Sequence, residues 1–263
     1  MKLFICPNGF TKKQTEQARN CVSILETQNE CALSISDSTY LFGNSSFAKF
    51  TPKESDLIVS IGGDGSLLRA AQTAITANKP LVGINSGTVG YLCPIDLHDV
   101  NHFNKLLGNL LLSERTLIEV EYNHKTLYAL NDIVIAKNNF GETINLSIST
   151  GNDNSVTLRG DGLIISTPTG STAYNLSAGG PVIDYKLPAF VLTPICPQKS
   201  FLHPVVINDN HQINVKVQNN KANLHCDGFK IGDINKDITI KKSNRKVCLY
   251  SQNTVNKDII TFS

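Results

Sequence analysis

A continuous apolar run leads directly into a glycine-rich loop in the first quarter of the chain. Residues 57–61 read Leu57-Ile58-Val59-Ser60-Ile61, and Gly62-Gly63-Asp64-Gly65-Ser66 follow at once. The next residues have helical character up to Asn78. An uninterrupted apolar strand is typical of a sheet that is covered on both faces. A strand, a short loop and a helix in this order therefore indicate a parallel α/β sheet.

The same alternation extends over residues 1–112. A short apolar run at 3–6 ends at a Pro-Asn-Gly turn, and a helical repeat begins after Thr11, whose side chain can cap it. Another short strand at 81–84 leads into a second glycine-bearing loop at 85–92. We predict an N-terminal parallel-sheet α/β domain over 1–112, with the two glycine loops side by side at one sheet edge.

Strand patterns replace helical ones from about Ser113 onward. Apolar and polar residues alternate at 118–122, with a hairpin turn at 123–125, and again in several later segments. Five prolines between 181 and 204 predict a long structured connection, because proline removes a ladder donor. We predict a C-terminal antiparallel β-sandwich-like domain over 113–239. The tail at about 240–263 could pack back on the first domain, and clefts between domains are common ligand sites.

Composition excludes several classes of protein. The chain has 263 residues, 41% hydrophobic and 17% charged, with a formal net charge of +2. These values argue against a disordered chain and against a dedicated nucleic-acid binder. The apolar runs are too short for a membrane span or a signal peptide. The seven cysteines are widely spaced, which argues against structural zinc and fits reduced thiols. We expect a cytoplasmic protein with no nucleic-acid or membrane partner.

Asp64 is the unusual member of the first glycine loop. The loop matches neither the dinucleotide-binding fingerprint nor the Walker loop. Glycines at a strand–helix junction suit phosphate. A carboxylate among them is unfavourable unless it binds a cation or takes a proton from a hydroxyl, and both are roles in phosphoryl transfer. The alternative is a turn in which the aspartate is a local hydrogen-bond acceptor.

Two later segments are candidate ligand sites. In the run 160–181 an apolar strand ends in a dense cluster of hydroxyls and glycines that suits a sugar or phosphate, and Tyr174 could stack on a ring. The alternative there is a Ser/Thr-rich turn and helix cap. Asn131 and Asp132 interrupt another apolar strand, and a ligand hydroxyl is a plausible partner for such a pair. The alternative is an edge strand or bulge with solvated side chains.

These segments, in this order, resemble the NAD kinase family. The matching pieces are residues 62–66, 83–92, 131–132 and 161–181, with Pro194–Pro197 and Pro204–Val206 as further landmarks. Diacylglycerol-type lipid kinases and phosphofructokinases carry similar glycine loops, so the first loop alone is not specific. The run 167–174, Thr-Pro-Thr-Gly-Ser-Thr-Ala-Tyr, is far more specific, and the resemblance spans roughly 55 to 235.

The resemblance implies an enzyme that transfers the γ-phosphate of ATP, or of polyphosphate, to the 2′-hydroxyl of the adenosine ribose of NAD. The product is NADP, and Mg²⁺ or another divalent cation is the expected cofactor. No protein ligand to the metal is identified from the sequence. Members of the family are usually dimers or tetramers, so the resemblance implies a homodimer or homotetramer. The NAD site in this family can include a neighbouring subunit.

The same resemblance implies roles for individual residues. Asp64 is expected to be the general base, and Asn131 and Asp132 are expected to bind the NAD ribose hydroxyls. The expected phosphate-binding residues are Gly62, Gly63, Gly65 and Ser66. Further substrate contacts are expected from Gly65, Tyr91, Arg159, Asp161, Thr172, Ala173, Tyr174 and Ser177.

The chain departs from the family pattern at two of these places. Asp132 stands where the family often has glutamate, and Phe229 stands where many members have glutamine. Residues 136–143 match too poorly to carry over any role.

Two other functions remain as alternatives. One is a diacylglycerol-type lipid kinase, which requires an apolar surface for a lipid tail. The other is a non-catalytic NAD(P)-binding sensor, which binds NAD without turnover.

Overall fold

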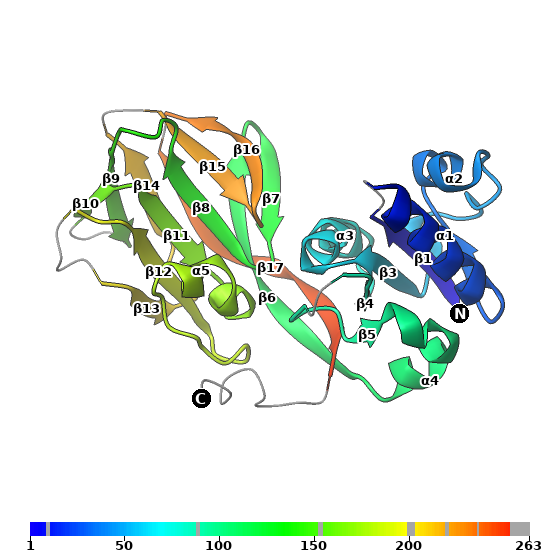
Figure 1. The fold of residues 1–263 in the computed structure, drawn as a ribbon. Coiled ribbons are helices and arrows are strands. Elements are labelled where there is room, and N and C mark those ends of the chain that lie inside the picture. Colours follow the sequence, from blue (N-terminus) through cyan, green and yellow to red (C-terminus); the bar gives the residue numbers. More distant parts are fainter. Residues whose placement is uncertain are drawn as a thin grey trace. The chain divides into compact units, whose positions relative to one another are not determined.

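The computed structural model describes residues 1–8, 11–87, 90–151, 155–198, 203–218, 221–235 and 237–252. Parts of two predicted segments, Thr88 and Val89 of the second loop and residues 253–263 of the tail, lie outside these ranges. The chain divides into two compact units. Unit 1 is Met1–Glu114 with a return of the chain that begins at Val247, and unit 2 is Arg115–Lys246. Figure 1 labels their elements.

Unit 1 is built on a parallel sheet with the strand order β2-β1-β3-β4. Strand β4 also pairs in parallel with β5 and with Leu249 of β17. The bounds are β1 (Lys2–Pro7), β2 (Glu30–Ala32), β3 (Leu57–Gly62), β4 (Leu81–Asn85), β5 (Ile95–Asp96) and β17 (Ile238–Ser251). The strands predicted at 3–6, 57–61 and 81–84 are confirmed.

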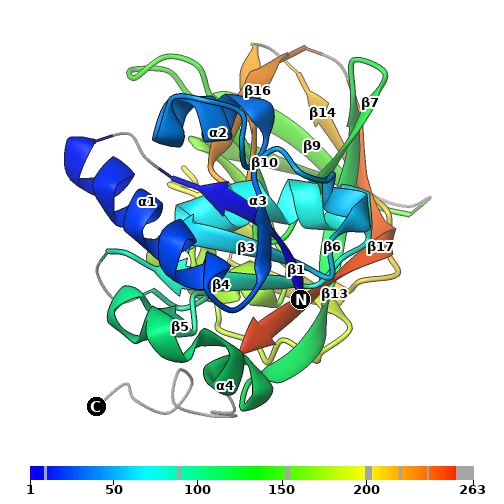
Figure 2. The ribbon, with the colours of Figure 1, turned by 90° about the vertical axis from the view of Figure 1, so that its right-hand side faces the viewer.

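Helices cover both faces of this sheet. They are α1 (Lys12–Glu26), α2 (Ile35–Phe42), α3 (Asp64–Ala77) and α4 (Phe103–Gly108), with the 3-10 turns η1 (Pro52–Glu54) and η2 (Leu97–His102) (Figure 2). Helix α1 packs with η2 and α4 on one face, where Val22 and Phe103 join Leu3 in one core. On the other face, a Cβ at Gly83 would lie 2.7 Å from Leu67 of α3. Cover on both faces explains the continuous apolar run of β3.

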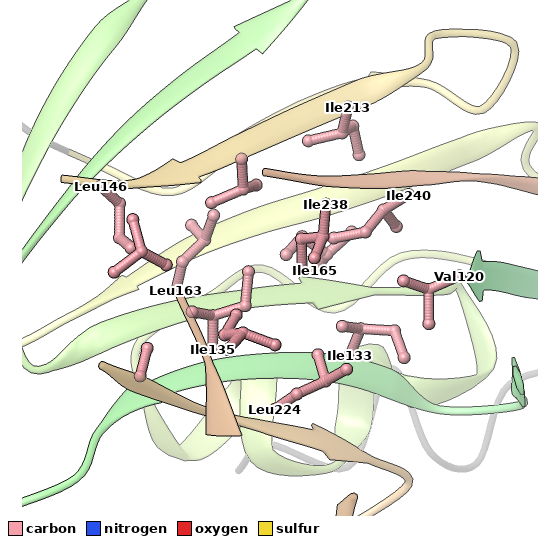
Figure 3. Packing of buried hydrophobic residues seen from close by; sticks show 14 of the residues in the cluster. Val120, Ile133, Ile135, Leu146, Leu163, Ile165, Ile213, Leu224, Ile238 and Ile240 are labelled. Atoms are coloured by element: carbon pink, nitrogen blue, oxygen red, sulfur yellow. The ribbon is translucent and has the colours of Figure 1, made fainter. Parts of the chain in front are cut away.

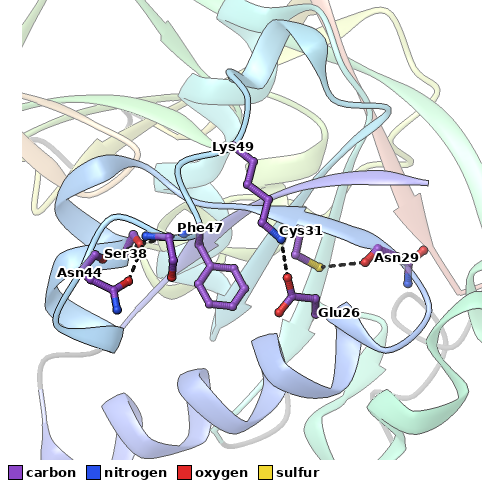
Figure 4. A network of polar contacts seen from close by, with 8 residues as sticks. Glu26, Asn29, Cys31, Ser38, Asn44, Phe47 and Lys49 are labelled. Carbon is purple, nitrogen blue, oxygen red and sulfur yellow. Dashed lines mark hydrogen bonds and ion pairs between the residues drawn. The ribbon is translucent and has the colours of Figure 1, made fainter.

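Local polar contacts fix the ends of the first two helices. The Thr11 side chain accepts from the N–H of Gln14, and the Gln14 side chain accepts from the N–H of Thr11, so the predicted cap of α1 is confirmed as a capping box. Ser38 of α2 donates to the carbonyl of Asn44 at 2.7 Å, just beyond the end of that helix. Figure 4 shows this contact with the Lys49–Glu26 ion pair.

Unit 2 consists mainly of antiparallel strands. One sheet has the order β13-β12-β11-β8-β15-β16, and a second layer holds β10-β9-β14-β17 and the hairpin of β6 and β7. The bounds are β6 (Leu111–Tyr122), β7 (Lys125–Ala129), β8 (Asp132–Lys137), β9 (Ile144–Thr150), β10 (Val156–Gly160), β11 (Gly162–Ser166), β12 (Ala189–Ile195), β13 (Val205–Asn208), β14 (Ile213–Val217), β15 (Ala222–Cys226) and β16 (Phe229–Ile234). The 3-10 turn η3 (Thr169–Thr172) and the short helix α5 (Tyr174–Ser177) follow β11.

One apolar core joins the two layers of unit 2. Ile133 and Leu163 from the first sheet pack in the same cluster as Ile213 and Ile240 from the second layer (Figure 3). The alternating pattern of apolar residues in the sequence supplies this core, because every second side chain of a strand points to the same face. The fold class is therefore the predicted one, an α/β part followed by a sandwich-like antiparallel β part.

Two expectations about strands were wrong. The proline-rich stretch 181–204 is more than a connection, because it contains β12, which pairs with both β11 and β13. The pairing between β12 and β13 ends at Leu192. Pro194 lies beyond that point, so its missing N–H removes no hydrogen bond to β13. The edge-strand alternative for Asn131 and Asp132 is also wrong, since β8 lies between β11 and β15.

Candidate functional site

Strand β3 delivers the first glycine loop to the start of α3. Gly62 has a φ of +150°, and a Cβ there would lie 2.2 Å from Oγ of Ser66, so a side chain does not fit. A Cβ on Gly63 or Gly65 would meet nothing within 4 Å, which leaves open space beside the first turn of the helix. Backbone N–H groups at a helix start attract phosphate. The geometry of this loop therefore suits a phosphate ligand.

The Asp64 side chain is held by the second glycine loop. Its Oδ2 accepts from the N–H of Tyr91 at 2.9 Å and its Oδ1 from the N–H of Leu92 at 3.1 Å. The two loops meet because β3 and β4 pair in parallel, with Gly62 opposite Asn85. Their predicted adjacency at one sheet edge is confirmed. The Tyr91 side chain is 66% exposed, so its backbone, not its ring, makes the contact with Asp64.

The donor set of unit 1 fits a metal that arrives with a phosphate. The described residues contain no group of three or more His, Cys, Asp or Glu side chains that could hold a metal ion. Mg²⁺ commonly binds through one or two carboxylates together with substrate phosphates and water. Asp64 supplies one carboxylate beside the glycine loop. Its oxygens accept two N–H bonds and the side chain is also hydrogen-bonded to the Cys93 thiol, which leaves about one of the roughly four lone-pair sites of a carboxylate for a further partner.

In unit 2 the carboxylate of Asp227 fixes the backbone around Asn131 and Asp132. It accepts hydrogen bonds from the N–H groups of Leu130 at 2.9 Å, Asn131 at 2.7 Å and Asp132 at 3.2 Å. Asp132 and Asp227 are 4% and 5% exposed. Two buried carboxyl groups thus lie close together in unit 2.

Burial raises the pKa of the Asp132 carboxyl to about 7, and the nearby Asp227 charge adds to this rise. Burial likewise raises the pKa of Asp227 to about 6, and the three backbone N–H bonds oppose that rise. Those three bonds favour the ionised form of the Asp227 carboxyl. Asp132 changes charge near neutral pH, where a carboxyl group can either donate a hydrogen bond to a ligand hydroxyl or accept one.

Asn131 carries a buried acceptor that is unused within the described part of the chain. Its Oδ1 is fully buried and has no hydrogen-bond partner there, and the residue as a whole is 9% exposed. An unsatisfied buried acceptor costs roughly 1–3 kcal/mol. A ligand hydroxyl that donated to this atom would remove that cost.

The hydroxyl-rich run after β11 divides into an inner and an outer half. In the inner half, Thr167 Oγ1 donates to the carbonyl of Leu130 at 2.5 Å, and Ser171 Oγ donates to that of Pro168 at 2.8 Å. Ser166, Thr167 and Ser171 are fully buried. The turn-and-cap alternative therefore describes these inner hydroxyls, which support the fold.

The outer half presents the residues that were predicted to contact substrate. Thr172 and Ala173 are half-buried, and Tyr174 and Ser177 are exposed. Gly170 brings this run against the Asn131 segment, because a Cβ there would lie 2.1 Å from the Asn131 carbonyl oxygen. The structure thus gathers Asn131, Asp132 and the 169–177 run in one part of unit 2.

Arg159 and Asp161 lie away from that group within unit 2. Strands β8 and β11 pair with Ser166 opposite Asp132 and Gly162 opposite Ala136. Asp161 precedes β11 and is five residues from Ser166, so it lies at the other end of this strand pair from Asp132, roughly 17 Å along the strand. The Asp161 carboxylate forms an ion pair with Lys137 at 2.9 Å, and Arg159 Nε donates to Thr143 Oγ1 at 3.4 Å.

Asp227 was missed as a site residue from the sequence. Its Asp-Gly pair indicates a turn, and the residue has a φ of +50° in that turn. Its hydrogen bonds reach residues more than 90 positions earlier. The sequence feature that could have marked Asp227 as a site residue is its position as a lone acidic residue directly after the alternating strand at 222–226.

Family models match both parts of the chain. The model for the ATP-NAD kinase N-terminal domain matches residues 3–114, and the model for the ATP-NAD kinase C-terminal domain matches residues 130–251. Together they cover most of the chain.

Individual relatives agree with these matches. An NAD kinase of Methanothermobacter thermautotrophicus is 37% identical over 199 residues, which is 73% of this chain and 70% of the relative. An NAD kinase of Chlorobium luteolum is 34% identical over 261 residues, 95% of this chain and 91% of the relative. A crystal structure of an NAD kinase from Archaeoglobus fulgidus in complex with ATP has the same fold, with a TM-score of 0.74 at 24% identity over 98% of this chain and 96% of that one.

Proposed function

The chain belongs to the NAD kinase family, and from this premise we propose that it transfers the γ-phosphate of ATP to the 2′-hydroxyl of the adenosine ribose of NAD. The products are NADP and ADP. The observation that carries the proposal is the Asp64 carboxylate, held at the first turn of α3 between two glycines with open space beside them. Polyphosphate is the alternative donor.

Asp64 is the proposed general base. The 2′-oxygen of the ribose attacks the γ-phosphorus, the bond from that phosphorus to the β–γ bridging oxygen breaks, and the hydroxyl proton passes to the Asp64 carboxylate. The N–H groups of Tyr91 and Leu92 orient the carboxylate and leave a lone pair for this proton. A divalent cation bound to the phosphates, Mg²⁺ or another, would neutralise the charge that develops on them.

The backbone of the glycine loop is the proposed phosphate path. Gly62, Gly63, Gly65 and Ser66 surround the start of α3, where the helix dipole and the backbone N–H groups favour negative charge. The absence of a side chain at Gly63 and Gly65 lets a phosphate approach the backbone closely.

Asn131 and Asp132 are the proposed ligands of the NAD ribose. The unpartnered Oδ1 of Asn131 accepts from a ribose hydroxyl, and Asp132 accepts from or donates to another. Because aspartate is shorter than the glutamate that is frequent in this family, the Asp227 contacts that fix the backbone of residues 130–132 gain importance.

The remaining proposed contacts surround the rings of NAD. Thr172, Ala173, Tyr174 and Ser177 frame the adenine and nicotinamide ends, and the exposed ring of Tyr91 serves the adenine side. Arg159 and Asp161, at the far end of the β8–β11 pair, are proposed to reach NAD bound to a neighbouring copy of the chain. This assignment accompanies the proposed homodimer or homotetramer.

The proposed compartment is the cytoplasm. None of the seven cysteines, each within the described ranges, forms a disulfide, which fits a reducing environment. No helix of the described ranges could span a membrane. NAD and ATP are the proposed partners, and no nucleic-acid or membrane partner is proposed.

The test is formation of NADP from NAD, ATP and Mg²⁺ by the wild type and by Asp64→Asn. Removal of a general base lowers kcat by about 10²–10⁴-fold. Asp99→Asn is the matched control, because Asp99 is exposed in η2 and belongs to neither glycine loop. A folded wild-type chain that binds NAD but forms no NADP would instead support the sensor. Loss of both binding and turnover would reopen the lipid-kinase alternative.

A further inference from the structure

Asn175 lies in the middle of the hydroxyl-rich run after β11, and none of the roles above uses it. Its side chain is fully buried. Nδ2 donates to the carbonyl of Ser171 at 2.9 Å, four residues earlier, and to the carbonyl of Pro181 at 3.0 Å, six residues later. Both hydrogens of the amide are therefore used. A single side chain thus joins the two ends of the segment 171–181.

The amide oxygen of Asn175 connects this segment to the first sheet of unit 2. Its Oδ1 accepts from Oγ1 of Thr193 at 2.6 Å, and Thr193 is itself fully buried. Thr193 lies in β12, opposite Ile164 of β11. Figure 1 shows α5, which contains Asn175, beside β12. The Asn175 amide therefore links a surface segment to a paired strand.

The end of the segment packs directly on this amide. A Cβ on Gly180 would lie 1.9 Å from Oδ1 of Asn175 and 2.6 Å from Oγ1 of Thr193, so a side chain does not fit there. The N–H of Gly180 also donates to the backbone carbonyl of Asn175 at 2.8 Å. The position of the Asn175 side chain therefore determines the path of the backbone that returns past it.

Local helical structure cannot hold this segment by itself. Helix α5 has only four residues, and an isolated helix of that length is not stable in water. The segment contains the residues that are proposed to frame the rings of NAD, which are Thr172, Ala173, Tyr174 and Ser177. Because the backbone on both sides of them is bonded to the same amide, their placement depends on Asn175.

We propose that Asn175 is a positioning residue for NAD: it holds these four outer residues in the arrangement that binds the rings, and Thr193 fixes it to β12. The inference rests on the proposed function and deepens it. Asn175 acts through the carbonyls of Ser171 and Pro181, and it needs no contact with the substrate.

Two substitutions break this network from different sides. Asn175→Ala removes the amide, and Thr193→Val removes the hydroxyl that donates to it while keeping a side chain of similar shape. Thr193→Ser keeps the hydroxyl and is the conservative variant. Thr239→Val is a matched control, because Thr239 Oγ1 donates to Oδ1 of Asn214 at 2.9 Å at an exposed position of β17. Ile213→Val lowers stability in the core of unit 2 without touching the network.

Each full-length variant is titrated with NAD by calorimetry, assayed with NAD, ATP and Mg²⁺, and unfolded with urea. For Asn175→Ala we expect the Kd and the KM for NAD to rise by about tenfold or more, and for Thr193→Val by a smaller factor. The KM for ATP should stay within about twofold of the wild type, as should all NAD values of Thr193→Ser and of the two controls. A lower urea midpoint for Asn175→Ala with an unchanged Kd for NAD would overturn the proposal. An equal rise of that Kd in Ile213→Val would overturn it too.

Hydrogen exchange tests the same network without any nucleotide. In the ligand-free chain, the amides of residues 169–181 should exchange about tenfold faster in Asn175→Ala and in Thr193→Val than in the wild type. The two controls should leave that exchange unchanged. If the wild type neither binds NAD nor forms NADP, the proposed function fails. Equal exchange in the wild type and in Asn175→Ala overturns the positioning role whatever the enzyme assay gives.

Discussion

The backbone N–H of Asn131 donates a hydrogen bond to Oδ1 of Asp227 at 2.7 Å, although the two residues are 96 positions apart in the chain. With the bonds from Leu130 and Asp132, this contact makes Asp227 a positioning residue for the proposed ribose site. It acts through the backbone and needs no contact with the substrate.

Replacement of the Asp227 carboxylate should lower the free energy of unfolding and weaken NAD binding. Asp227→Ala leaves three buried backbone donors without their acceptor, and each unsatisfied buried group costs roughly 1–3 kcal/mol. We expect urea denaturation to give a loss of about 3 kcal/mol or more, and kinetics of any stable fraction to give a raised KM for NAD. Asp233→Ala is the control, because its exposed ion pair with Lys230 is worth about 1 kcal/mol or less. Equal losses in the two variants would contradict the assignment.

The buried carboxyl pair should make stability depend on pH. The pKa of Asp132 is raised from 3.8 in the unfolded chain to about 7, so the folded state keeps a proton that the unfolded chain releases. The free energy of unfolding therefore falls as pH rises through this window. Asp132→Asn removes the pH-dependent part of the free energy of unfolding that comes from the Asp132 carboxyl. The free energy of unfolding of the variant, relative to that of the wild type, should therefore increase from about pH 5 to about pH 8. Urea denaturation at both pH values measures the difference, and a difference that is constant with pH would refute the prediction.

Gly170 should tolerate no side chain. A Cβ there would lie 2.1 Å from the carbonyl oxygen of Asn131, so Gly170→Ala must displace one of the two backbones. We expect a loss of about 1–3 kcal/mol in stability and weaker NAD binding. Gly141→Ala is the matched control, since its Cβ would meet nothing within 4 Å, and it should stay within about 0.5 kcal/mol of the wild type. NAD affinity that is unchanged in Gly170→Ala would argue against a binding role for the Asn131 segment.

The absence of a side chain at Gly90 should be needed to keep the Asp64 carboxylate in place. A Cβ on Gly90 would lie 2.4 Å from Oδ1 of Asp64 and would push the proposed base out of place, whereas a Cβ on Gly87 in the same loop would lie 3.9 Å from its nearest neighbour. We expect kcat to fall by about 10²-fold in Gly90→Ala and to change little in Gly87→Ala. In an Asp64→Asn background, Gly90→Ala should cause almost no additional loss. A full additional loss would mean that the glycine acts independently of Asp64.

Much of unit 1 could be predicted because its signals are local. The buried strand 57–61, the glycine loop and the helix after it are adjacent in the sequence, and β3 and α3 form there. The meeting of the two glycine loops also followed from a general property, since neighbouring parallel strands bring their carboxyl ends to one sheet edge. The hairpin was readable from the alternation on both sides of residues 123–125, although the turn itself is Asn123 and His124, because Lys125 already pairs with Tyr122.

The parts that were missed depend on distant or weak signals. β2 has only three residues, and α2 has eight, so neither carries a long periodic pattern. Pro194 argued against a strand with partners on both sides, although β12 pairs with both β11 and β13. The sequence does not show that the pairing with β13 ends before Pro194. The Asp227 contacts connect residues whose proximity follows from sheet order alone.

The inner hydroxyls of the 166–171 run have a consequence for how such sequences are read. Ser166, Thr167 and Ser171 donate to backbone carbonyls of their own unit, so the fold needs them whether or not a nucleotide is ever bound. Selection for stability alone would retain these three residues in a descendant protein that had lost phosphotransfer activity. A motif search would still assign that descendant to the family. Evolutionary evidence of retained activity should therefore be sought at the outer residues of the run, Thr172, Tyr174 and Ser177, and at Asp64.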